Sequence, residues 1–143
     1  MPRAIYCADG RVRVIHFATD DPALIARDTN ALLAEEPGAT WADVSELPNR
    51  RFRAAWTKGG AANVIVDVAK ARDIRVTEIR AERDIVLAAT DGVLLRDQEQ
   101  GVDTRILLQR RQALRDAPQQ AVMDLAILRT PDEIAAYTPE VLK

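Results

Sequence analysis

The sequence predicts an α+β fold, in which a small N-terminal antiparallel β-sheet with one helix precedes a C-terminal helical portion. Short stretches with strand-like alternation, separated by Gly and Pro turns, occupy the first half of the chain. From Asp67 onwards the apolar spacing becomes helical, with capping residues and breakers between the helices. The chain therefore divides into a small α+β domain over residues 1–67 and a helical portion over residues 68–143. The helical portion is expected to be a helical hairpin plus a short terminal helix.

Composition limits the classes of partner. The chain has 143 residues, of which 48% are hydrophobic, so it is long enough to bury a core. Eight basic and nine acidic residues precede position 68, and twelve and thirteen follow it. Such a balance gives no reason to expect a nucleic acid or an anionic membrane surface as the partner. No apolar run of about 18 residues occurs, so no membrane-spanning helix is expected.

The strands of the first domain are predicted from turns and alternation. Asp9-Gly10 is a two-residue turn signal that is typical of antiparallel hairpins, so a strand is expected on each side of it. Trp41 and Val44 flank a third, short strand. Residues 51–57 and 63–66 are expected to form two more strands around a Lys-Gly-Gly turn, and the last is β-branched at three successive positions.

Four helices are predicted from their ends. The first begins after Asp20 or Asp21, with a Pro in its first turn, and stops at Pro37-Gly38. The second runs from about residue 67 to about 89, followed by a link over 92–101. The third starts at Asp103 or Thr104 and ends at Pro118, with a shorter apolar piece over 122–128. The last starts at Thr130, which forms a capping box with Glu133.

The helix that starts near Asp67 has two apolar rows. One row holds Val68, Ile79 and Val86, and the other holds Ala71, Ile74, Ala81, Ile85 and Ala88. Arg75, Glu78 and Glu82 lie between or beside the rows. Burying each large side chain is worth about 1.5–3 kcal/mol, whereas a helical ion pair is worth about 0.2–0.5 kcal/mol, so packing decides where this helix lies.

Two interpretations of this two-sided helix remain open. It can lie centrally, between the α+β domain and the helix over 104–117. Alternatively, one row faces another subunit or a partner, and the charged residues set the register of that contact. In the second interpretation, Arg75, Ile79, Glu82 and Val86 are candidate partner-binding residues.

Two motifs in the helical portion resemble bacteriophage tail assembly chaperone-like proteins. The first is "IRAERDIVLAATD" at residues 79–91, and the second is "RRQALRDAPQ" at residues 110–119. The resemblance extends over about residues 47–143. It implies a non-enzymatic protein of the phage tail, associated with the tail tip or tail fibres, that acts through protein–protein contacts. It leaves open a permanent tail component and a transient assembly factor.

The same resemblance implies partners and a location. Phage tail or tail fibre proteins are the expected partners, and a homo-oligomer is expected. The expected location is the virion tail, or the host cytoplasm during assembly. The second motif also places Arg111 and Arg115 four residues apart on one helix. These arginines can clasp acidic residues of the preceding helix if the two fold back as a hairpin, or they can bind a partner.

Residues that could carry catalysis are few. His16, Cys7 and Ser45 are the single histidine, cysteine and serine of the chain, so no Cys/His zinc set can form. The "DVSEL" around Ser45 lacks the glycines of a nucleophile elbow, and "TKGG" at 57–60 is too short for a phosphate-binding loop. The sequence therefore predicts no enzyme, no catalytic residue, no metal site and no cofactor.

The alternative function is a small nucleic-acid-binding module that uses the Arg50–Lys58 segment. Its basic residues flank Phe52 and Trp56, a composition that can hold phosphates and stack bases. If the segment is a strand, Arg51 and Arg53 share a solvated face and the aromatic residues share a core face. That pattern makes nucleic acid the less favoured partner, and Trp56 is kept as a candidate partner-binding residue.

Overall fold

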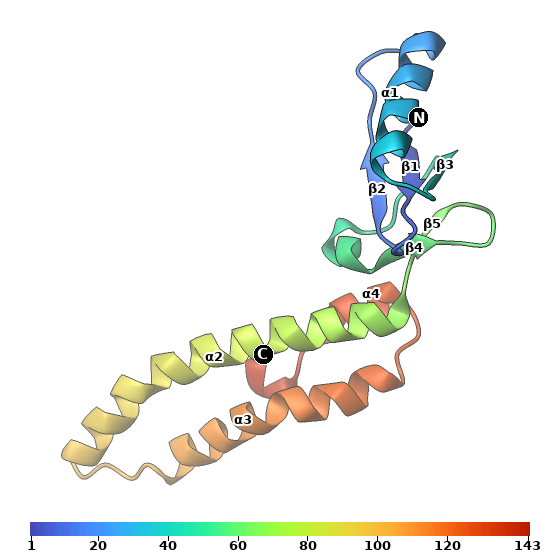
Figure 1. Cartoon of the computed structure of the whole chain (residues 1–143). Helices are drawn as coiled ribbons and strands as arrows, with labels where there is room; N and C mark the ends of the chain where they lie inside the picture. The colour runs from blue at the N-terminus through green and yellow to red at the C-terminus, as the bar shows by residue number, and fades with distance from the viewer. The chain divides into compact units, whose positions relative to one another are not determined.

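The computed structural model describes all 143 residues, which form two compact units, Met1–Asp67 and Val68–Lys143 (Figure 1). The first, the N-terminal unit, holds the strands and one α-helix, and the second, the helical unit, holds helices alone. The α+β class inferred from the sequence is therefore confirmed. The elements of the N-terminal unit are β1 (Arg3–Tyr6), β2 (Val12–Ile15), α1 (Pro22–Glu35), β3 (Thr40–Asp43), the 3₁₀-helix η1 (Arg50–Ala55), β4 (Trp56–Lys58) and β5 (Val64–Val66).

Two antiparallel sheets build the N-terminal unit. β1 is central in the first and pairs with both β2 and β3, so that Ala4 lies opposite Val14 on one side and Ala42 on the other. β4 and β5 form the second sheet. Because side chains alternate along a strand, Ala4 and Tyr6 of β1 enter the same core, where they meet Val44, Trp56 and Val64.

The first hairpin has a longer loop than the sequence suggested. The Gly10 N–H donates to the Cys7 carbonyl (3.0 Å), and the Cys7 N–H donates to the Arg11 carbonyl (2.9 Å). The connection is therefore the three residues 8–10, in which Gly10 takes the left-handed conformation (φ +85°) that follows a tight turn. Asp9-Gly10 correctly located the turn, but the two-residue length was wrong.

The strand predicted over 51–57 is also wrong in its first part. Residues 50–55 form η1, which the Asn49 side chain caps by accepting from the Arg51 N–H (2.9 Å). A 3₁₀-helix repeats every three residues, so Phe52 and Ala55 share one side, and both are completely buried. The local cap and this burial outweigh the strand-like alternation, and only Trp56–Lys58 pairs as a strand.

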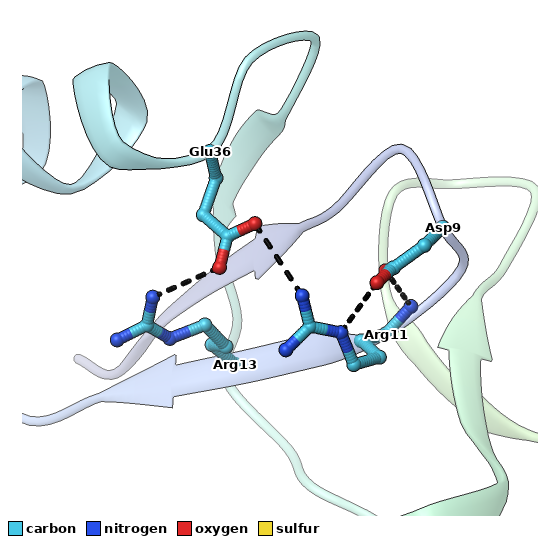
Figure 2. A network of polar contacts seen from close by, with 4 residues as sticks. All are labelled: Asp9, Arg11, Arg13 and Glu36. Atoms are coloured by element: carbon cyan, nitrogen blue, oxygen red, sulfur yellow. Dashed lines mark hydrogen bonds and ion pairs between the residues drawn. The ribbon is translucent and has the colours of Figure 1, made fainter.

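α1 begins as expected but touches the sheet sparingly. Asp21 caps it by accepting from the Ala23 N–H (2.9 Å), and Thr29 is its one buried residue. Charged contacts hold its C-terminal end, where the Glu36 carboxylate accepts from Arg13 (3.2 Å) and from Arg11 (3.5 Å), and Arg11 also binds Asp9 (Figure 2).

The helical unit is a long hairpin closed by a C-terminal segment. α2 (Val68–Glu99) and α3 (Arg105–Ala126) pack along each other, α4 (Pro131–Ala136) packs on α2, and the 3₁₀-helix η2 (Glu140–Leu142) packs on α3 (Figure 1). The predicted capping box of α4 is confirmed, since Thr130 and Glu133 each bind the other's backbone N–H. No helix combines the length and the apolar run needed to cross a membrane.

Both hairpin helices extend beyond their predicted C-terminal ends. α2 continues through Gly92, an exposed position where glycine costs only about 1 kcal/mol, and stops at Glu99. Gly101, in the left-handed conformation (φ +68°), ends the helix. Its N–H donates to the Gln98 carbonyl, and the Val102 N–H donates to the Asp97 carbonyl. α3 continues through Pro118 to Ala126 and so includes most of the piece predicted separately over 122–128. Proline inside a helix costs about 3 kcal/mol, and the apolar stripe on both sides of it offsets that cost.

The apolar stripe of α3 should dominate the stability of the helical unit. Leu114→Ala removes a completely buried side chain, and we expect it to lower the free energy of unfolding by about 2–5 kcal/mol. Leu95→Ala is the matched control, because Leu95 is exposed and its loss should change stability by less than about 0.5 kcal/mol. Urea denaturation followed by helical circular dichroism measures both. Equal effects of the two substitutions would show that the stripe does not hold the unit together.

Candidate functional site

Arg75 ties α2 to the C-terminal segment. It is only 2% exposed, and its Nε and Nη2 atoms donate to the Tyr137 carbonyl at 3.0 and 2.9 Å. Its Nη1 atom donates to Glu78 (3.1 Å) and Glu82 (2.8 Å) one and two turns along the same helix. The Tyr137 hydroxyl in turn donates to Asp124 of α3 (2.6 Å). This network joins α2, α3 and the C-terminal segment. It lies toward the end of the hairpin where α2 begins and α3 ends, which we call the base of the hairpin.

Arg111 joins the two hairpin helices farther along. Its guanidinium is buried and donates to three groups of α2: the Leu87 carbonyl (3.2 Å), the Thr90 hydroxyl and the Asp91 carboxylate (2.6 Å). The expectation that an arginine of the second helix clasps an acid of the first is therefore confirmed for Arg111. Arg115 lies exposed on α3 instead of joining the clasp.

The spacing of charges along α2 does not by itself give its ion pairs. Arg80 and Asp84 are four residues apart, the spacing of a helical ion pair. Asp84 instead accepts from its neighbour Arg83 (2.8 Å), and Arg80 is exposed. Arg83 is adjacent to Asp84 and reaches its exposed carboxylate, although Arg80 has the usual spacing of a helical pair. Spacing alone therefore does not decide which arginine binds this carboxylate.

The candidate partner-binding residues fall into two groups. Arg75, Ile79, Arg111 and Trp56 are buried within their own units, where they pack or donate hydrogen bonds to the chain itself. The other three, Glu82, Val86 and Arg115, are partly or fully accessible. The role of all seven in partner binding stays a prediction, and the buried four can affect a partner only by holding the surface around them.

Several exposed apolar side chains lie in and around the segment where the sequence predicted a link. We call residues 85–108, which hold the end of α2, the turn and the start of α3, the distal end of the hairpin. Ile85 is 72% exposed and Ile106 is 82% exposed, and the distal end also exposes Val93, Leu95, Val102 and Leu108. Ile85 was expected to be buried, and that expectation is wrong because the base of the hairpin takes up the packing of α2. Several large apolar side chains exposed in one stretch are typical of a protein-binding surface.

The residues considered for catalysis are dispersed. His16 and Ser45 are exposed, whereas the Cys7 thiol is buried, and burial is the main cause that raises its pKa. A thiol with a raised pKa stays protonated and is a poor nucleophile. No cluster of three or more His, Cys, Asp or Glu side chains is arranged to hold a metal ion.

The basic and aromatic residues of 50–58 are segregated, over the helix η1 and the short strand β4 that follows it. Phe52 is completely buried and Trp56 is 4% exposed, so neither ring is available to stack on a base. Lys58 is also engaged, since its ammonium lies over the Tyr6 ring and donates to the Thr40 hydroxyl (3.4 Å). The aromatic part of the nucleic-acid alternative therefore has no exposed surface.

Comparison with known proteins bears on the hairpin. Residues 76–129 match the family model described as phage tail assembly chaperone protein, and this segment contains α3 and most of α2. No curated protein and no solved structure matches the chain. The resemblance drawn from the two motifs is confirmed, and over this segment the chain is similar to phage tail assembly chaperone proteins. The match supports a tail-associated assembly role rather than catalysis.

The Arg111 clasp gives a direct stability test. Arg111→Met keeps most of the apolar stem and removes the guanidinium, which leaves Thr90 and Asp91 without their buried donor. We expect a loss of about 1.5–3 kcal/mol in the free energy of unfolding. Arg110→Met removes the same charge from an exposed neighbour and should change stability little. Chemical denaturation of both variants measures the difference, and an equal loss in the two would contradict the clasp.

The base network predicts an alkaline transition. Burial, followed by the hydrogen bond to Asp124, raises the pKa of Tyr137 to about 12. The folded unit thus favours the neutral phenol, and this contribution is complete below the ordinary pKa of about 10 and is lost as the pH rises towards 12. Phenolate absorbance should show a late step that disappears in Tyr137→Phe and persists in Tyr6→Phe. A Tyr137 phenol that titrates at the ordinary value would mean that the bond to Asp124 does not form.

Proposed function

We propose that the protein is a non-enzymatic bacteriophage tail assembly factor that binds tail proteins through the distal end of its hairpin. The single observation that carries this proposal is the overlap of two features. The segment matched by the phage tail assembly chaperone model contains the whole distal end, and the distal end exposes large apolar side chains. Burying each of these against a partner would contribute about 1.5–3 kcal/mol, enough for a few of them to support specific association.

The base of the hairpin supports this role by fixing the helices. Leu114, Leu125 and Ile134 are completely buried there, and the Arg75 network links the same region to the C-terminal segment. Arg111 then holds α2 and α3 together beside the distal end. A surface held in place before binding loses less conformational freedom on association, which favours affinity.

The partner is proposed to be a tail tip or tail fibre protein, bound in the host cytoplasm while the tail is assembled. Glu82, Val86 and Arg115 are the accessible residues of the original candidate set, and we include them at the edge of the binding surface. Self-association of the protein is proposed as well, because exposed apolar side chains can equally be covered by a second copy. Size-exclusion chromatography with light scattering distinguishes a monomer from an oligomer.

Charge substitutions in the distal end should abolish partner binding without unfolding the protein. We expect the tagged double variant Leu95→Glu and Ile106→Glu to lose the tail protein that the wild type captures from infected cells, because a carboxylate cannot be buried against an apolar surface at low cost. Mass spectrometry identifies the captured protein, and circular dichroism checks the fold.

The matched control is Ile65→Glu, which places the same charge at an exposed isoleucine of the N-terminal unit. It should retain the tail protein. The proposal fails if the wild type captures no tail protein, or if the double variant captures it as well as the control does.

A further inference from the structure

The N-terminal unit contains a cationic cavity that the proposed function does not use. It measures ≈ 160 Å³ and is lined by Val14, His16, Leu47, Arg50, Arg53 and Trp56. Three of these residues, His16, Arg50 and Arg53, are exposed and carry N–H donors. No carboxylate lines the cavity. We call it the Arg50–Arg53 cavity.

The local helix explains why two arginines meet at this cavity. Arg50 and Arg53 are exposed residues of η1 that line the cavity, whereas Phe52 and Ala55 of the same segment are completely buried. Asn49 caps the start of the segment. The core therefore fixes the segment that carries the two arginines.

Both arginines lack an acidic partner within the chain, unlike their neighbours. Arg3 pairs with Asp43 (2.7 Å) and Arg13 pairs with Glu36 (3.2 Å), whereas Arg50 and Arg53 form neither an ion pair nor a side-chain hydrogen bond. Trp56 adds a third unmet donor, because its indole Nε1 atom is buried with no acceptor. Buried donors are usually paired, and Trp56 lines the cavity, so its unpaired N–H supports an acceptor that binds there.

We propose that the Arg50–Arg53 cavity binds a single carboxylate from an acidic segment of a partner protein. The two guanidinium groups bind the oxygen atoms of the carboxylate, and the indole N–H of Trp56 and the imidazole of His16 complete its donors. Val14 and Leu47 provide apolar walls for the methylene groups of a glutamate side chain.

The size and surroundings of the cavity favour one carboxylate over a nucleic acid. Its volume suits one small oxyanion, and the nearby aromatic residues are buried and cannot stack bases. Arg51 does not line the cavity, and Lys58 is engaged with Tyr6 and Thr40, so Arg50 and Arg53 are the cationic arginine groups that the cavity itself offers. The assignment of the carboxylate to a protein rests on the proposed function, whereas the affinity for an oxyanion rests on the cavity alone.

The test follows the indole N–H signal of Trp56 by NMR of the full chain, titrated with a short, end-blocked oligoglutamate peptide at constant ionic strength. Trp41→Phe assigns the two indole signals. We expect the Trp56 signal to move downfield and saturate, while the Trp41 signal stays in place. The double variant Arg50→Gln and Arg53→Gln should bind the peptide at least about tenfold more weakly, because it loses two charge-assisted donors.

The control is Arg80→Gln with Arg110→Gln, which removes the same net charge from exposed positions of the helical unit. It should bind the peptide as the wild type does. An unmoved Trp56 signal, or equal weakening in the two double variants, overturns the proposal. Tighter binding of inorganic phosphate or of an oligonucleotide than of the peptide overturns the assignment to a protein carboxylate.

Capture from infected cells separates this inference from the proposed function. If the wild type captures a tail protein but the peptide does not shift the Trp56 indole N–H signal, the cavity proposal fails and the proposed function stands. If the peptide binds as expected but no tail protein is captured, the cavity binds carboxylates and the proposed function fails.

Discussion

The helical unit depends on two buried arginines. A buried guanidinium is costly unless its donors are satisfied, and Arg75 and Arg111 satisfy most of theirs on groups of a different segment of the chain. Arg75 requires the Tyr137 carbonyl, and Arg111 requires Thr90 and Asp91. Each therefore selects one register between the elements that it joins, because a shift along the helix would leave a charge buried without partners. Apolar packing around Leu114 supplies stability, and the arginines supply the alignment.

That alignment has a consequence for the rest of the hairpin. The completely buried apolar side chains Leu114, Leu125 and Ile134 lie outside the distal end, which keeps several large apolar side chains in water. Val122, Met123 and Ile127 near the end of α3 are exposed as well. A monomeric protein gains nothing from such exposure, so a partner or a second copy is the natural means of covering it. The N-terminal unit presents a different chemistry, since its own unpaired groups are cationic and donate hydrogen bonds. The two binding surfaces that we propose therefore differ in chemistry, one being apolar and the other polar.

Local signals in the sequence predicted much of the fold. The caps at Asp21 and Thr130 and the turn at Asp9-Gly10 were correct because each depends on residues within a few positions. The α+β class followed from the change of apolar period near Asp67. The family resemblance also came from a local signal, the two arginine-rich motifs.

The wrong predictions concern positions where tertiary contacts, and not local sequence, determine the secondary structure. Gly92 and Pro118 favour a helix end by propensity, yet both lie inside helices: Arg111 of α3 binds α2 just before Gly92, and buried side chains flank Pro118 in α3. The alternation at 51–56 suited a strand, and only the core shows that residues 52 and 55 share a side. The exposed distal end could not be predicted for the same reason. A two-sided apolar pattern does not reveal which residues the chain itself leaves uncovered.

Hydrogen–deuterium exchange of the protein, free and bound to its tail partner, tests most directly whether the distal end is the binding surface. Backbone amides over residues 85–108 should gain protection in the complex, while those around Leu114 and Leu125 are already protected in the free protein and change little. Unchanged exchange over 85–108, with protection gained only elsewhere, would contradict the central role given to the distal end.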